Sequence, residues 1–210
     1  MRTEDGLPRF EIICRGKSLG EFTLKVPGRH NVLNSTAAIA LACEEGIAPD
    51  VARKALAAFG GVKRRCELLG KSPRGVLVYD DYAHHPTEVA ATLQGIRDAH
   101  PDRRIIVVFQ PHLYSRTQDH HESFGAAFVN SDVLLVCDVY GAREAAVPGV
   151  TGALVSDSAY RRGHLDARFI AAKENALEIL RREAVSDDLI LLMGAGNIWN
   201  LGAKLLEELV

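Results

Sequence analysis

The sequence predicts an α/β fold in which a mainly parallel sheet, with helices on both faces, follows a smaller region made of a hairpin and two helices. After Cys66, short apolar runs alternate with stretches of helical pattern. Continuous apolar strands separated by helices are typical of a parallel sheet that is buried on both faces. Before position 60 strand signals are few, and 210 residues suffice for one large domain or two small ones.

The first region reads as the tail of a larger domain. Two β-type runs flank a turn at Gly16 and Lys17, which is a hairpin signal, and Pro27 with Gly28 ends the second run. Two helices follow, the second of which is stopped by glycines. The expected elements are strands 9–15 and 19–26 and helices 34–45 and 49–59.

The second region alternates strands with helices. Its expected strands are 76–79, 105–109, 133–139, 167–170 and 189–193. Its expected helices are 87–99, 120–128, a stretch within 150–162, 173–182 and 197–209. The boundary between the regions lies near residues 60–65, and we place it between Lys63 and Arg64, which gives domains 1–63 and 64–210.

Composition excludes several classes of protein. A net charge of −2 argues against a nucleic-acid binder, because binding to the phosphate backbone needs a basic surplus. No run of eighteen apolar residues is available to span a membrane, and residues 1–9 lack the apolar stretch of a signal peptide. The four cysteines are dispersed and form no Cys-x-x-Cys pair, so they read as small buried hydrophobes. We therefore expect a cytoplasmic protein without nucleic-acid or membrane partners.

The densest polar cluster is the segment from Tyr79 to Thr87, just past the end of an apolar strand. Side chains at the carboxyl ends of parallel strands face the crevice where ligands bind. Two carboxylates, a phenol and two imidazoles are expensive to bury there without a purpose. The alternative is that Asp80, His84 and Thr87 only cap the following helix.

A second cluster, Phe109 to Thr117, follows the next expected strand. We expect His112 and Arg116 to face the same crevice as the first cluster. Arginine offers a planar fork suited to a carboxylate or a phosphate. The alternative for Arg116 is a surface salt bridge.

Two shorter segments complete the candidates. Asn31 and Asn34 can present amide donors and acceptors to the edge of a base, although N-capping is the alternative for Asn34. At the expected boundary, the basic pair Arg64 and Arg65 can reach phosphates, and the alternative is a solvated pair of charges.

Together these segments resemble the Mur ligases, the ATP-dependent enzymes that build the peptidoglycan stem peptide. Residues 28–34 are similar to the family's H-N-x-x-N segment, and residues 62–67 to its R-R-x-[DE] junction. Residues 80–89 match the D-D-Y-x-H-H-P-T-E-V segment of the alanine-adding member, and residues 109–117 its F-Q-P-H-x-x-[ST]-R-T segment. The tripeptide-adding recycling member shares the first of these two segments, so the second favours L-alanine.

The resemblance implies a Rossmann-like C-terminal ligase domain at 64–210, preceded by the end of the central ATP-binding domain at 1–63. It implies that ATP phosphorylates the lactyl carboxylate of UDP-N-acetylmuramate and that the amine of L-alanine attacks the acyl phosphate. The implied nucleotide contacts are Asn31 and Asn34 to adenine, Asp81 to the ribose and Arg65 near the phosphates. The implied L-alanine pocket contains Tyr82, His84, His112 and Arg116.

The sequence departs from the family pattern at its start. No P-loop of the form G-x-x-x-x-G-K-[ST] and no UDP-binding domain are present. The resemblance places the magnesium ligands before the H-N-x-x-N segment, so we expect the chain alone to be inactive and assign no metal site to it.

Two readings from other classes remain open. One is a metal-dependent phosphohydrolase built on Asp80, Asp81, His84, His85 and His112, since carboxylate and imidazole ligands suit manganese or zinc. The other is a non-catalytic module that binds a nucleotide or a partner.

Overall fold

The structure, a computed structural model, describes residues 1–4 and 6–209. The chain divides into two compact units. The first contains residues 1–62 together with 94–101, and the second contains residues 63–93 and 102–210. The assignment of the first unit to the end of an ATP-binding domain stays a prediction.

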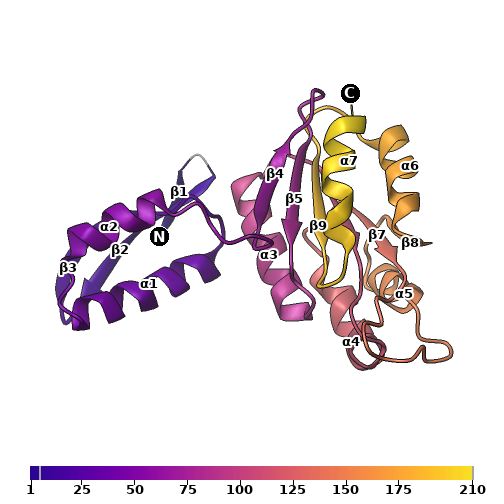
Figure 1. The fold of residues 1–210 in the computed structure, drawn as a ribbon, viewed down its shortest axis with the longest axis horizontal. Coiled ribbons are helices and arrows are strands. Elements are labelled where there is room, and N and C mark those ends of the chain that lie inside the picture. The colour runs from indigo at the N-terminus through magenta and orange to yellow at the C-terminus, as the bar shows by residue number, and fades with distance from the viewer. Residues whose placement is uncertain (5, 210) are drawn as a thin grey trace. The chain divides into compact units, whose positions relative to one another are not determined.

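In the first unit two helices accompany a small antiparallel sheet (Figure 1). The sheet has the order β1-β2-β3, with β1 at Arg2–Glu4, β2 at Leu7–Cys14 and β3 at Lys17–Thr23. The helices are α1 (Arg29–Glu44) and α2 (Pro49–Ala58). Phe10 and Phe22 stack with ring centroids 6.0 Å apart, and Val32 and Ile39 of α1 join their apolar cluster. The predicted hairpin and both helices are confirmed.

The second unit is built on a six-stranded sheet with the order β4-β5-β9-β6-β7-β8. The strands are β4 (Glu67–Lys71), β5 (Leu77–Asp81), β6 (Ile105–Phe109), β7 (Val133–Cys137), β8 (Ala167–Ala171) and β9 (Leu189–Met193). Only β4, at one edge, pairs antiparallel; every other pairing is parallel. The predicted α/β fold with a mainly parallel sheet is therefore confirmed.

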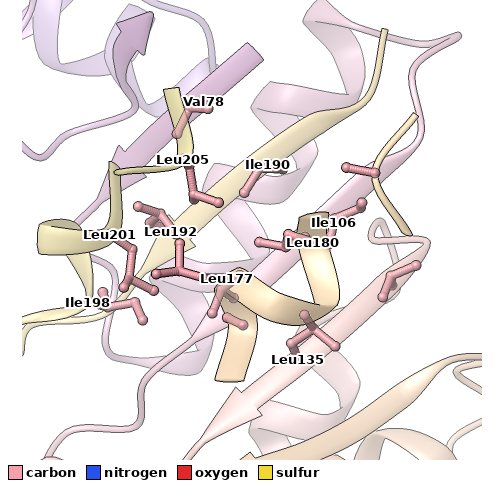
Figure 2. Packing of buried hydrophobic residues seen from close by; sticks show 14 of the residues in the cluster. Val78, Ile106, Leu135, Leu177, Leu180, Ile190, Leu192, Ile198, Leu201 and Leu205 are labelled. Atoms are coloured by element: carbon pink, nitrogen blue, oxygen red, sulfur yellow. The ribbon is translucent and has the colours of Figure 1, made fainter. Parts of the chain in front are cut away.

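Helices cover both faces of this sheet (Figure 1). Helices α6 (Glu174–Glu183) and α7 (Leu201–Glu208), the latter preceded by a 3-10 turn at Ile198–Asn200, lie on one face. Helices α3 (Pro86–Ala99), α4 (Tyr114–Ala127) and α5 (Ala153–Arg161) lie on the other. Figure 2 shows leucines of α6 and α7 meeting Ile106, Ile190 and Leu192 of the central strands. Because β6, β7 and β9 are buried along their whole length, their sequences are uninterrupted apolar runs.

Several predicted boundaries are wrong. The aspartates Asp80 and Asp81 were expected beyond their strand but are the last two residues of β5. Helix α1 begins at Arg29 rather than Asn34, so Asn34 does not cap it. Helix α4 begins at Tyr114 rather than near His120. The prediction missed its first turns because they are polar and carry no apolar periodicity. Strand β1 was missed because it has three exposed residues, and β4 was missed because it has no buried apolar run.

The sheet order determines which loops become neighbours. Strands β5, β9, β6 and β7 are consecutive and parallel, so the segments that follow them emerge at one edge of the sheet. These segments contain both of the polar clusters predicted from the sequence. In the described part of the chain, no helix combines the length and the apolar character needed to cross a membrane.

Candidate active site

The two aspartates at the end of β5 are buried and point to different partners, because successive side chains of a strand alternate between the faces of a sheet. Asp81 is 3% exposed. Its carboxylate accepts hydrogen bonds from the backbone N–H groups of Cys66 and Ala83, both at 2.7 Å. Burial raises the pKa of Asp81, and these hydrogen bonds oppose that rise. Asp81 thus links, by hydrogen bonds, the segment 64–67 (the junction segment) to the loop after β5.

Asp80, 1% exposed, pairs with Arg64 instead. The Nε atom of Arg64 donates to Asp80 Oδ2 at 3.1 Å, while its Nη2 atom donates to the Gly194 carbonyl oxygen at 2.6 Å. Burial raises the pKa of Asp80 to about 6, against the lowering effect of Arg64. Gly194 must be glycine here, because its φ is +145° and a Cβ would lie 2.5 Å from the carbonyl oxygen of Gln110.

The guanidinium groups of Arg64 and Arg65 both contact the ring of Tyr82. The guanidinium carbon of Arg64 lies 4.7 Å from the ring centroid, and that of Arg65 lies 5.6 Å away. Such cation–π contacts hold a guanidinium while leaving its donors available. The side chain of Arg65 is 52% exposed, so it presents a cation to solvent beside the buried Asp81.

The hydrogen bond of His84 defines the tautomer of its ring. His84 Nδ1 lies 2.9 Å from the carbonyl oxygen of Tyr82. A carbonyl oxygen can only accept, so Nδ1 carries the proton and the neutral ring keeps a lone pair on Nε2. His84 is half-buried and makes an edge-to-face contact with Tyr82, with 5.3 Å between ring centroids.

His112 has the opposite tautomer. Arg116 Nη1 lies 3.3 Å from His112 Nδ1, and a guanidinium can only donate. The neutral ring of His112 therefore accepts at Nδ1 and carries its proton on Nε2. Partial burial, with the charges of Arg116 and His84 adding to it, lowers the pKa of His112, so the ring is neutral at pH 7.

The structure brings the predicted L-alanine residues together. His84, from the loop after β5, and His112, from the loop after β6, have ring centroids 6.1 Å apart. Arg116, one turn further along in α4, is half-buried beside His112. Tyr82 adjoins His84. The sequence argument that polar loops meet at the carboxyl ends of parallel strands holds for these four side chains.

One member of this cluster was missed from the sequence. Tyr140, three residues beyond β7, stacks on His112 with 5.9 Å between ring centroids and 18° between planes. The two segments also exchange backbone hydrogen bonds, from Leu113 N to Tyr140 O at 3.0 Å and from Tyr140 N to Pro111 O at 2.8 Å. Tyr140 follows a buried parallel strand, so the rule that found His112 applies to it as well.

A second missed residue supports the start of α4. The carboxylate of Glu144 accepts hydrogen bonds from Ser115 N at 3.0 Å and Ser115 Oγ at 2.6 Å. Helix α4 has no side-chain hydrogen bond from its own N-cap, Leu113. Glu144 therefore supplies from a distant loop the acceptor that the helix end lacks, which fixes the turn that carries Arg116.

The two asparagines predicted to meet adenine belong to the first unit. Both lie in the first two turns of α1, three residues apart and so on one side of that helix. Asn31 Nδ2 donates to the carbonyl oxygen of Pro27 at 2.7 Å, whereas Asn34 is exposed.

The described residues contain no group of three or more His, Cys, Asp or Glu side chains arranged to hold a metal ion. The set Asp80, Asp81, His84, His85 and His112 therefore does not form a ligand cluster in the second unit, and it does not fit magnesium either. The carboxylates of Asp80 and Asp81 are buried and occupied by Arg64 and by backbone N–H groups.

Comparison with known proteins gives a consistent result. The family model described as "Mur ligase, glutamate ligase domain" matches residues 64–196. The chain is 43% identical over 209 residues to the UDP-N-acetylmuramate–L-alanine ligase of Salinibacter ruber, covering 100% of this chain and 44% of that protein. The chain thus spans less than half the length of this relative.

Solved structures of similar ligases have the same fold. The crystal structure of UDP-N-acetylmuramate-alanine ligase from Thermotoga maritima superposes with a TM-score of 0.82 at 29% identity, over 97% of this chain and 43% of that one. A murein peptide ligase from Psychrobacter arcticus gives a TM-score of 0.64 at 26% identity, over 96% of this chain and 42% of that one. Since the family model covers well over half of the sequence, the chain belongs to the Mur ligase family.

Proposed function

We propose that this chain is part of an ATP-dependent ligase that joins L-alanine to UDP-N-acetylmuramate, through an acyl phosphate, in peptidoglycan precursor synthesis. The observation that carries the proposal is the meeting of His84, His112 and Arg116 at the carboxyl edge of the sheet. The likeness to relatives named for this activity supports it.

Arg116 and His112 form the binding side of the proposed site. Arg116 Nη1 donates to the Nδ1 atom and to the carbonyl oxygen of His112, both at 3.3 Å, which leaves the N–H groups of Nε and Nη2 for a bidentate pair with the carboxylate of L-alanine. The Nε2–H of His112 adds a neutral donor. Because His112 is uncharged, it does not repel the guanidinium of Arg116 beside it.

His84 is the proposed proton acceptor. An ammonium group is not a nucleophile, so L-alanine first gives one proton to solvent and attacks as the free amine; its nitrogen then loses a second proton as it bonds to the acyl carbon. The lone pair on His84 Nε2 takes that proton. The C–N bond forms, the C–O bond to the phosphoryl group breaks, and phosphate leaves with the electron pair.

The proposed nucleotide contacts are Asn31 and Asn34 in the first unit, for adenine, and Arg65 and Asp81 in the second unit, for the phosphates and the ribose. The exposed cation of Arg65 suits phosphate oxygens, and the exposed amide of Asn34 suits the edge of adenine. Asp81 already accepts two backbone hydrogen bonds, and a ribose hydroxyl would use a remaining lone pair. No step is assigned to magnesium, because the described residues offer no cluster that fits it.

The tripeptide-adding recycling ligase is the second candidate within the family. A single assay separates the two, in which the gene product that carries these residues is given ATP and UDP-N-acetylmuramate with either L-alanine or the tripeptide. We expect ADP formation that depends on L-alanine and is at least tenfold slower with the tripeptide. The reverse preference would replace the proposal with the recycling activity. ATP binding without turnover on either substrate would leave a nucleotide-binding module.

A further inference from the structure

Glu88 holds the start of helix α3. Its Oε2 atom accepts hydrogen bonds from the backbone N–H groups of His84 at 3.0 Å and His85 at 3.2 Å. Glu88 is the third residue of a helix that begins at Pro86, and glutamate or glutamine at this position commonly accepts from the N–H of the capping residue. On these contacts alone, Glu88 is a helix cap.

The same carboxylate also meets two groups of the site. Glu88 Oε2 lies 3.4 Å from His84 Nδ1, and Oε1 lies 3.9 Å from Arg65 Nη1. The contact with Arg65 is exposed and contributes little stability by itself. The contact with His84 is more buried, since that imidazole is only 24% exposed.

Glu88 is ionised at neutral pH. Partial burial raises the pKa of Glu88, but the hydrogen bond from His84 N–H and the nearby charges of His84 and Arg65 outweigh it, so the net shift is downward. The Tyr82 carbonyl oxygen already accepts the Nδ1–H of His84 and sets its tautomer, so the contribution of Glu88, 3.4 Å from Nδ1, is its negative charge, which stabilises the protonated form of the ring. A helix cap has no such requirement for charge.

We propose that Glu88 is a positioning residue for His84, whose negative charge stabilises the imidazolium that forms when Nε2 takes the proton from the amine. The proposal rests on the proposed ligase function. The backbone N–H groups of His84 and His85 keep the carboxylate in place, and Arg65, the expected phosphate contact, lies 3.9 Å from its other oxygen.

Glutamine separates the two roles of Glu88. In Glu88→Gln the side-chain oxygen still accepts from the backbone and preserves the cap, while the charge is lost. Glu88→Ala removes both the cap and the charge. Glu122→Gln is the matched control, because Glu122 is an exposed glutamate of α4 whose partner is Arg162.

Three readouts test the proposal. The first is the NMR titration of the His84 imidazole in this chain, assigned with His84→Gln. The second is kcat and KM for L-alanine in the gene product that carries the chain. The third is the midpoint of thermal unfolding. We expect Glu88→Gln to keep the unfolding midpoint, to move the titration of His84 down by about half a pH unit or more, and to lower kcat roughly tenfold with little change in KM.

The opposite results are equally clear. If Glu88→Gln titrates and turns over like the wild type, or if it loses stability as Glu88→Ala does, Glu88 is a cap and the proposal is overturned. The titration is read without substrates, so it judges Glu88 even if the ligase function fails. If instead His84→Gln retains full kcat, the proposed role of His84 fails, and the catalytic role of Glu88 fails with it.

Discussion

The imidazole of His112 lies flat on the phenol ring of Tyr140, with 18° between the ring planes. The two residues come from the loops after β6 and β7, which are neighbouring parallel strands. Backbone hydrogen bonds between these loops hold the rings in register. His112 is therefore oriented from two sides, by the guanidinium of Arg116 on Nδ1 and by the stacked ring of Tyr140.

Loss of this stacking should weaken substrate binding. An aromatic pair contributes about 0.5–1.5 kcal/mol beyond the area it buries. We expect Tyr140→Leu to raise KM for L-alanine roughly 2- to 10-fold, and Tyr140→Phe, which keeps the ring, to stay within twofold of the wild type. Steady-state kinetics at saturating ATP measure this. Equal KM values for the leucine and phenylalanine variants would show that the ring does not orient His112.

Asp80 should make stability depend on pH in an unusual direction. Its folded-state pKa of about 6 lies above the ordinary 3.8, so between these values the folded protein binds more protons than the unfolded chain. The contribution of Asp80 therefore falls as pH rises from 4 to 6 and is constant above that range. The difference corresponds to at most about 3 kcal/mol.

The variant Asp80→Asn tests this assignment. Because the asparagine oxygen can still accept from Arg64 Nε, the main change is the loss of the titrating group. We expect the free energy of unfolding of the variant, relative to wild type, to rise between pH 4 and pH 6. Urea unfolding at several pH values gives the difference directly. A difference that does not vary with pH would place the folded-state pKa of Asp80 at its ordinary value.

The sequence identified the parts of the fold that rest on continuous patterns. Strands 105–109 and 189–193 were predicted to the residue, because each apolar run is bounded by polar residues or glycine, whereas the strand predicted at 133–139 ends two residues earlier, at Cys137. Strand β4 was missed because it is a partly exposed edge strand with a register shift between Leu68 and Gly70. The start of α4 was missed because its support comes from Glu144, which is distant in sequence.

In the candidate site too, contacts between residues close in sequence could be predicted, and contacts between distant segments could not. His112 and Arg116 are neighbours in sequence and were placed together correctly. The hydrogen bond between Asp81 and Cys66 and the ion pair between Glu88 and Arg65 form only because residues 64–67 fold against the end of β5 and the segment that follows it. Hydrophobic periodicity carries no signal for such a contact. Tyr140 could have been found by applying the strand-end rule to β7 as well as to β5 and β6.

Loss of the Asp81 carboxylate should lower the free energy of unfolding as well as the affinity for ATP. Asp81→Asn replaces one acceptor with an amide N–H that faces a buried backbone donor from Cys66 or Ala83. A buried donor left without its acceptor costs about 1–3 kcal/mol. We expect a loss of that size in urea unfolding, with a rise in the Kd for ATP measured on the folded variant. A variant as stable as the wild type would contradict the structural role, and an unchanged Kd would contradict the ribose contact.

The most direct test concerns Arg116 and the carboxylate of L-alanine. In the gene product that carries this chain, KM for L-alanine is compared between wild type, Arg116→Lys and the control Arg161→Lys, whose arginine bonds Ser158. Lysine keeps the charge but loses the bidentate fork. The account predicts that Arg116→Lys raises KM for L-alanine about tenfold or more, with KM for ATP and the control nearly unchanged. An unchanged KM for L-alanine in Arg116→Lys would contradict the assignment of this edge of the sheet as the amino-acid site.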